Sequence, residues 1–443
     1  MRRFLPIVVL AIAALPAAAG AQSFHLRDLL TDFLREGITL ATPPAGFPSH
    51  EAHFIAEDSP QFLAMQQFNG LIANQLSSFP LASSAGGFAY TYDPALGVFV
   101  RSTESFGPVY AERADTLGKG RFNLGLNYSH FTFDEVNGLS LSDGDVRLVF
   151  THQDVNHDHT GLEPFFEGDL ITTQLAMKIT SDITAFVFSY GITDRLDVST
   201  AIPIVKVAID ARADAAINRL ATGGVAPGIH RFLNGGDTES FTRSGSASGV
   251  GDVVLRAKYR LTSSTNQGFA LAVDARLPTG DQENLLGTGA TQFLAYAIGS
   301  FHFGAFSPHA NVGYQWALHP ADGIHQPSQI VYTGGFDVSV GPKLTFVADI
   351  LGRTYVNTQV VSVRDTVFTA NTNPSPTGPP NLVSATLPRL VSESGDLNTL
   401  LGSAGIKINP VGNLLLTVNG LFSISKQGLQ DKFTPLVGLD YSF

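Results

Sequence analysis

The chain has 443 residues, a formal net charge of -11 and no cysteine. The lack of thiols excludes a disulfide scaffold, a lipoprotein anchor and a cysteine metal site, and the negative charge argues against binding to nucleic acid. Aromatic residues make up 10%, charged residues only 15%, and glycines number 44, a composition that suits strands facing lipid on one side.

The first residues predict an export signal. Arg2 and Arg3 precede an apolar run from Phe4 to Leu15, and small residues follow at 19–21. The run is too short to cross a bilayer and has the form of a signal-peptide core ahead of a cleavage site. We therefore expect residues 1–21 to be a Sec signal peptide, and the mature chain to be exported to the outer membrane of a Gram-negative cell.

Residues 22–118 do not alternate as a barrel would. Apolar residues at helical spacing predict two helices, one containing Leu26, Leu29, Leu30, Phe33 and Leu34, and one from Phe62 to Leu76 that begins at Ser59–Pro60. A hairpin is expected around Asp93–Pro94. This N-terminal segment either plugs the lumen of a barrel or caps its periplasmic mouth, and the pattern leaves both open.

From residue 119 onward, apolar and polar residues alternate in strand after strand. In the clearest hairpin, Leu255 and Tyr259 share one face, while Arg256 and Lys258 share the other. No apolar stretch after the signal is long enough for a membrane helix, which leaves a closed barrel as the spanning structure. We predict an all-β fold, a transmembrane antiparallel β-barrel of about twelve strands over residues 119–443, with fourteen as the alternative, after a short, partly helical N-terminal segment.

The expected strands are placed near residues 119–128, 171–189, 195–211, 249–261, 267–278, 291–303, 306–318, 328–340, 343–360, 395–409, 413–426 and 431–443. Short turns separate alternate pairs, and long outer loops are expected at 134–168, 212–248 and 362–394. From Ile171 to Ser189 apolar and polar residues alternate without interruption. We therefore expect one continuous strand that projects beyond the bilayer. Pro203 is expected to mark a bulge.

The last strand ends on an aromatic residue. Val437, Leu439, Tyr441 and Phe443 share one face, which suits lipid contact. This ending resembles the signal that the outer-membrane assembly machinery reads, so we expect Phe443 to be recognised by it.

Three stretches carry a family resemblance. Residues 191–198 (GITDRLDV), 249–261 (GVGDVVLRAKYRL) and 276–281 (RLPTGD) resemble the outer-membrane transporters linked to the meta-pathway of phenol degradation. The likeness extends from Gly118 onward, and its motifs mark turns and strand starts. It implies the barrel fold and a role in the passage of small compounds, aromatic ones among them, but no solute-binding residue.

The charged residues at the polar positions of the alternating strands are the candidate lining of the lumen. They are Lys178, Asp182, Asp252, Arg256, Lys258, Arg260, Asp274, Arg276, Asp349, Arg353 and Lys407. In a water-filled pore such mixed charges orient polar solutes. The competing interpretation is a ladder of cross-strand ion pairs that keeps a narrow lumen rigid.

One outer stretch could hold a metal ion. Asp154, Asn156 and Asp158 alternate like the start of a calcium loop, but His159 replaces the glycine that the turn needs. His152, His157 and His159 could instead hold a transition metal, and a solvated loop explains the same residues. No nucleophile motif or cofactor fingerprint is recognisable, so we expect no enzyme and no cofactor.

The sequence therefore predicts a passive outer-membrane channel for small organic solutes. Its expected partners are outer-membrane lipid, the barrel assembly machinery and a small-molecule solute, with no nucleic acid. The alternative is a structural or surface-binding barrel whose lumen is blocked.

Overall fold

The computed structural model describes residues 25–45, 51–56, 59–78, 80, 82–83, 87, 90–93, 98–101, 103–153, 167–223, 228–262, 266–318, 326–375 and 378–443. Its helices are α2 (Leu29–Gly37), α3 (Glu51–Phe54) and α4 (Pro60–Leu76). Its strands are β1 (Tyr90–Asp93), β2 (Val98–Arg101), β3 (Phe122–Phe133), β4 (Glu135–Val136), β5 (Leu139–Ser140), β6 (Val146–Thr151), β7 (Leu170–Gly191), β8 (Leu196–Asn218), β9 (Thr238–Val250), β10 (Val254–Arg260), β11 (Gln267–Arg276), β12 (Thr291–Phe301), β13 (Phe306–Leu318), β14 (Gln329–Ser339), β15 (Leu344–Asn371), β16 (Leu382–Ile408), β17 (Leu414–Ser423), β18 (Leu429–Gln430) and β19 (Thr434–Ser442).

Twelve antiparallel strands close into a barrel. The ring runs β7-β3-β19-β17-β16-β15-β14-β13-β12-β11-β10-β8, and the pairing of β8 with β7 closes it. The predicted count of twelve is confirmed. The alternative of fourteen is wrong, because β6 and β9 stand at the two ends of the sheet order and outside the ring.

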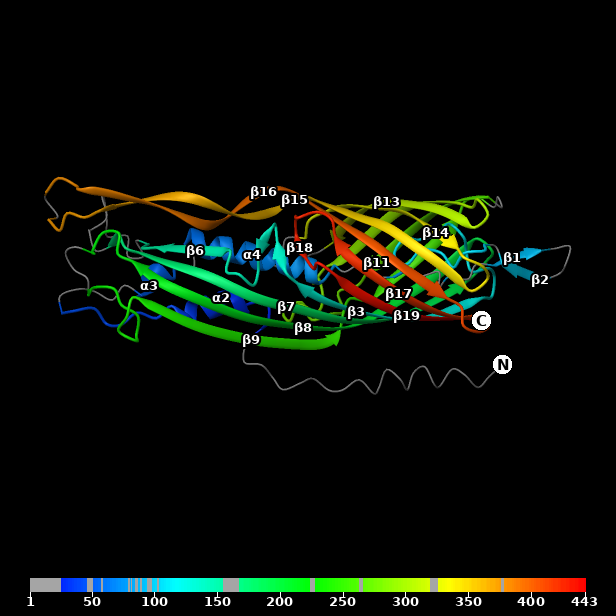
Figure 1. The fold of residues 1–443 in the computed structure, drawn as a ribbon, viewed down its shortest axis with the longest axis horizontal. Coiled ribbons are helices and arrows are strands. Elements are labelled where there is room, and N and C mark those ends of the chain that lie inside the picture. Colours follow the sequence, from blue (N-terminus) through cyan, green and yellow to red (C-terminus); the bar gives the residue numbers. More distant parts are fainter. Residues whose placement is uncertain are drawn as a thin grey trace.

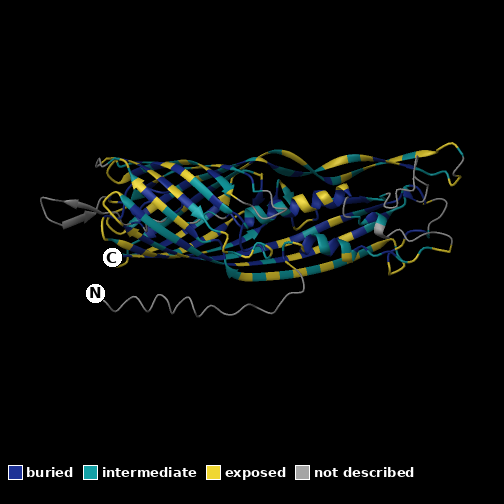
Figure 2. Ribbon diagram, turned by 180° about the vertical axis from the view of Figure 1, so that it is seen from behind, coloured by how far each residue is buried: buried dark blue, intermediate teal, exposed yellow. Residues whose placement is uncertain are grey.

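The outer wall of the ring is an apolar belt. In the β10–β11 hairpin, Arg256 faces Asp274 and Tyr259 faces Leu271 across the ladder. Tyr259 and Leu271 are 47% and 51% exposed, whereas Lys258 is 1% exposed. Figure 2 shows the same alternation of buried and exposed positions around the barrel. A closed barrel with an exposed apolar outer face is what lipid requires, so the chain is an outer-membrane β-barrel.

Two pairs of strands are much longer than a membrane requires. β7 and β8 have 22 and 23 residues, and β15 and β16 have 28 and 27, whereas about 9–11 suffice to cross a bilayer. They project past the shorter strands at the end opposite the C-terminus (Figure 1). The short turns and the C-terminus lie at the other end, which is the periplasmic end of such barrels.

The projecting half reverses the polarity that the barrel half shows. On β7, Ile171, Leu175 and Ile179 point inward and are at most 1% exposed, while Gln174 and Lys178 on the opposite face are exposed. The sequence predicts that these apolar residues face lipid, and that prediction is wrong. Above the bilayer the outside is water, so the apolar face turns to the interior, where it packs against the N-terminal helices.

Both predicted helices and the strand pairing of the predicted hairpin are confirmed. The Ser59 hydroxyl accepts a hydrogen bond from the Phe62 amide and caps α4. The α2 and α4 side chains share one apolar core with β7 and β8, and Figure 1 shows these helices between the projecting strands. β1 pairs with β2, with Asp93 opposite Val98, and the predicted turn at Pro94 lies outside the described residues. No helix in the described part of the chain is long and apolar enough to cross a membrane.

Three predicted outer loops contain regular structure. The stretch 134–168 holds β4, β5 and β6, the stretch 212–248 holds the end of β8 and most of β9, and 362–394 is part of the β15–β16 hairpin. Pro203 does mark an irregularity in the ladder, as predicted, although the extra residue lies in the opposite chain. β8 stays in register with β7 from Asn218 to Asp197. Between the Ile204–Val250 pair with β9 and the Ala201–Val254 pair with β10, however, two residues of β8 face three of the partner chain.

Candidate functional site: the occupied lumen

The chain just before β3 runs inside the barrel. We call residues 103–118 the lumen segment, and all of them except Glu104 are buried. It has no regular secondary structure, so its amides need partners from the wall. The Glu112 amide donates to Asn311 (2.8 Å), the Ala114 amide to Ser300 (3.0 Å) and the Leu117 amide to Asp197 (2.9 Å). Side chains of the barrel therefore take the place of a neighbouring strand.

Glu112 is the electrostatic centre of the lumen segment. Its carboxylate is 3% exposed and forms ion pairs with Arg256 and with Lys258, the latter at 3.5 Å. Arg256 also holds Asp274 through two hydrogen bonds of 2.7 and 2.6 Å, and Lys258 donates to the Arg113 carbonyl at 3.1 Å. A buried carboxylate among such partners is costly to remove, because the cations would remain desolvated.

Further contacts hold both ends of the lumen segment. Asp115 lies 3.5 Å from Arg260 and 3.1 Å from His302. The Lys407 ammonium donates to the carbonyls of Phe106 (3.3 Å) and Pro108 (2.6 Å). The segment is thus bound along its length to β10, β12 and β16.

Arg113 folds back on the segment itself. Its guanidinium donates to the Thr103 hydroxyl (3.0 Å) and to the Gly87 carbonyl (3.2 Å). Gly107 has a φ of +71°, and a side chain there would overlap Arg113. The Phe106-Gly-Pro stretch therefore provides the space for a buried arginine.

The structure places nine of the eleven predicted lumen residues on the inner side of the wall. These are Asp252, Arg256, Lys258, Arg260, Asp274, Arg276, Asp349, Arg353 and Lys407. Arg256, Lys258, Arg260 and Lys407 bind the lumen segment, and Arg276 donates to the Ser77 carbonyl at the end of α4. Asp252 instead holds the β11–β12 connection through Gly280 and Thr288.

The other two predicted lumen residues, Lys178 and Asp182, are misplaced by the sequence interpretation. Lys178 is exposed on the outer face of β7. Asp182 shares that face and contacts His130 at 2.7 Å and the exposed Tyr128 hydroxyl at 2.7 Å. Both residues occupy polar positions of the alternating pattern on β7. They lie in the part of the strand that projects above the bilayer, where these positions face external water.

A small cavity remains beside the lumen segment. Its volume is about 140 Å³, and Tyr110 and Glu112 of the segment line one side. The wall contributes four charged residues, which are Arg256, Asp274, Arg276 and Arg353. A second cavity of about 80 Å³ also touches Arg353. The charged lumen is therefore a nearly filled chamber, in which ion pairs occur beside a small space lined by charged and apolar side chains.

Several residues of this site were missed in the sequence. Glu112, Arg113 and Asp115 form a charged run directly before the first strand, and that position was the available signal. The sequence also gives no sign of the contacts of buried His309, which lies 3.3 Å from Asp337 and 2.6 Å from Asp349. Periodicity does not report such pairs, because their members are distant in the sequence.

Of the predicted metal ligands, only His152 can be placed. It follows β6 and lies 3.7 Å from Glu167. Asp154, Asn156, His157, Asp158 and His159 lie outside the described residues.

The central part of the chain matches a family model. Residues 167–371 match the family described as "Putative MetA-pathway of phenol degradation". The resemblance seen in the sequence is confirmed. The match begins just before β7 and ends with β15, so it covers the β10–β11 hairpin and most of the charged inner wall.

Solved barrels show a general likeness to this chain. The COG4313 outer membrane channel from Pseudomonas putida F1 has a TM-score of 0.42 and 14% identity, over 74% of this chain and 97% of that one. A Pseudomonas aeruginosa FadL homologue has a TM-score of 0.32 and 12% identity, over 82% and 97%. The Ralstonia pickettii toluene transporter TbuX has a TM-score of 0.28 and 11% identity, over 74% and 90%.

No curated protein matches the chain. Because the TM-scores are low, the assignment of the fold rests on the closed strand pairing of the barrel itself.

Proposed function

We propose that this protein is a passive outer-membrane channel for small organic solutes, with the lumen segment as its constriction. The observation that carries the proposal is the chamber between a non-covalently held segment and the barrel wall, which is lined by charged and apolar side chains. Ion pairs and single hydrogen bonds hold the segment, so its displacement breaks no covalent bond. The proposal includes no catalytic step and no cofactor.

The chamber suggests a class of solute. A cavity of about 150 Å³ accommodates one benzene ring, and the chamber here measures about 140 Å³. Three arginines and two carboxylates line it, and Arg276 and Arg353 donate to the neutral groups of Ser77 and Gln329. The excess positive charge favours a ring that carries a carboxylate or a phenolic oxygen. The phenol named in the family description fits the same class.

Uptake by cells tests this proposal. We expect a strain that lacks its general porins to take up labelled benzoate several-fold faster when it expresses this protein, and a two-ring carboxylate to gain less. Arg353→Gln is expected to reduce the benzoate rate, because it removes one of the cavity's positive charges. Equal uptake with and without the protein would refute the proposal.

The structure also supports a second candidate function. Among the described residues, the lumen segment and its partners occupy the periplasmic half of the barrel. A barrel closed in this way could act through its projecting outer half alone, as a structural or surface-binding protein. Conductance measurements separate the two candidates, as set out in the Discussion.

We also propose that Phe443 is read by the barrel assembly machinery. Its amide donates to the Phe122 carbonyl at 2.9 Å, and its ring stacks on Phe122 at 4.4 Å, where the last strand meets the first. Phe443→Ala is expected to lower the amount of folded protein in outer-membrane fractions several-fold, measured by heat-modifiable migration in gels.

Phe433→Ala is the matched control, because Phe433 is 62% exposed just before β19 and lies away from the terminus. Purified Phe443→Ala protein should refold into lipid vesicles as the wild type does. A refolding defect of the same size would assign Phe443 to stability instead of recognition.

A further inference from the structure

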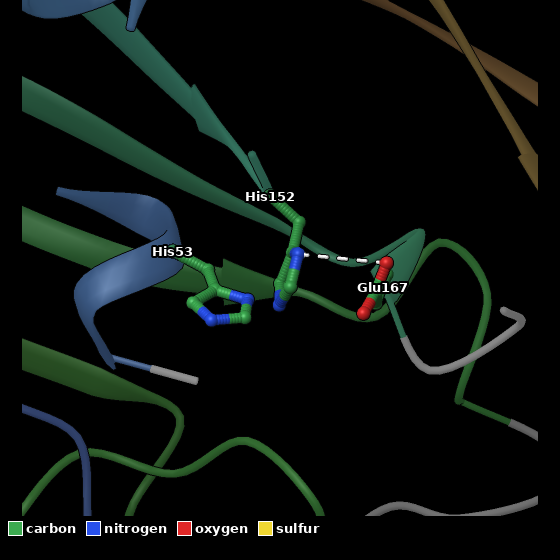
Figure 3. A group of neighbouring side chains, drawn as sticks. All are labelled: His53, His152 and Glu167. Carbon is green, nitrogen blue, oxygen red and sulfur yellow. Dashed lines mark ion pairs between the residues drawn. The ribbon is translucent and has the colours of Figure 1, made fainter. Parts of the chain in front are cut away.

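Three segments that are distant in the sequence meet at the outer end of the projecting half. His53 belongs to the last turn of α3, His152 follows β6, and Glu167 precedes β7. Their side chains converge (Figure 3), and one nitrogen from each histidine and one carboxylate oxygen all lie within 4.8 Å of one another. The Nδ1 atom of His152 is 3.7 Å from Oε2 of Glu167.

The donor set suits a metal ion, and two of its three side chains are buried. The His152 and Glu167 side chains are 2% and 3% exposed. Two imidazoles and one carboxylate are the ligands of a common zinc arrangement, and bond lengths near 2.0–2.1 Å put the ligands of a tetrahedral ion about 3.3 Å apart. The measured separations exceed this by at most about 1.5 Å, a change that rotation about the side-chain bonds supplies.

The backbone brings the two histidines together in advance. The Gln153 amide donates to the His53 carbonyl at 2.9 Å, which ties α3 to the chain after β6. The two imidazole rings consequently stand edge to face, with centroids 4.6 Å apart. Little chain entropy is therefore left to lose when an ion binds.

Neighbouring groups form a shell around the three ligands. The Phe54 ring packs edge-on against His152 at 5.2 Å and against His230 at 5.3 Å. His230 contacts the buried Asp169 at 2.9 Å, and that carboxylate also accepts hydrogen bonds from Ala221 and Thr222. We therefore assign His230 to the surrounding shell, where it fixes the position of Phe54. The apolar Phe54 ring in this shell limits the access of water to a metal.

We propose that His53, His152 and Glu167 bind one divalent transition-metal ion, with Zn²⁺ as the best fit, and that the ion fastens α3 to the wall. Imidazole and carboxylate ligands suit zinc better than calcium, which takes oxygen ligands. The ion would link the N-terminal segment to β6 and β7 at the outer end. This inference is independent of whether the barrel transports a solute.

Zinc titration of the full chain tests the site. Protein purified in detergent and stripped with a chelator is titrated with Zn²⁺ by calorimetry, and with Co²⁺ to record the visible spectrum of a tetrahedral ion. We expect one ion per chain. Glu167→Gln and His53→Ala should each weaken binding more than tenfold, because loss of an outer-shell partner alone costs about 10–100-fold in affinity.

His130→Ala is the matched control, because His130 also pairs with a carboxylate, Asp182, but on the outer face of the barrel. It should bind zinc as the wild type does. A His157→Ala/His159→Ala variant should also retain binding, and Zn²⁺ should protect α3 from protease in the wild type but not in Glu167→Gln.

Three results would overturn the proposal. The first is the absence of zinc binding by wild-type protein that migrates as a folded barrel. The second is loss of binding in the His157→Ala/His159→Ala variant while His53→Ala and Glu167→Gln still bind. The third is an equal loss in the His130→Ala control.

Discussion

Glu112→Gln is expected to raise the open probability of single channels in planar bilayers at least tenfold over the wild type. The Glu112 carboxylate is buried between Arg256 and Lys258. The glutamine side chain is neutral, so both cations would lose the negative charge that this carboxylate supplies. Breaking one side of a buried ion pair costs about 3–5 kcal/mol, and each 1.4 kcal/mol changes a population about tenfold. The displaced state of the lumen segment should therefore become far more populated.

Glu36→Gln is the control for this experiment. Glu36 lies in α2 of the same N-terminal segment and pairs with Arg243 at 2.6 Å, but its side chain is 66% exposed. Exposed pairs contribute about 0–1 kcal/mol, so this variant should conduct as the wild type does. If Glu112→Gln and the wild type are both silent while both migrate as folded barrels, the channel proposal fails and the blocked barrel remains.

Phe68→Ala is expected to loosen the projecting half while the barrel ring stays folded. Phe68 is fully buried on α4 in the core shared with β7 and β8. A Phe-to-Ala change in a core costs about 3–5 kcal/mol. Because that core lies outside the lipid belt, the loss should appear as faster amide exchange in α4 and in the outer parts of β7 and β8. The β10–β14 strands should keep their protection.

Leu63→Ala provides the comparison on the same helix. Leu63 is 46% exposed, so its removal should change stability by less than about 0.5 kcal/mol. Uniform loss of protection across the ring in Phe68→Ala would show that the two halves unfold together, and would contradict the independence of the projecting half.

Much of the architecture follows from local pattern. Alternation along residues 249–278 predicted the β10–β11 hairpin and the outward direction of Leu255 and Tyr259, and the structure agrees. The strand count and the short periplasmic turns followed from the same rule, because side chains of a strand must alternate between its two faces. Helical spacing and the cap at Ser59 likewise predicted α4.

The identity of the medium on each face was decided by the tertiary structure. Lys178 and Arg256 both occupy polar positions of the alternating pattern on their strands. Lys178 nevertheless faces external water, whereas Arg256 pairs with Glu112 inside the barrel. The difference depends on height relative to the bilayer and on what fills the interior. Both are set by contacts between distant parts of the chain, as in the pairing of Arg256 with Glu112 and the approach of His53 to Glu167. Periodicity reports which residues share a face, and only the folded chain determines what that face meets.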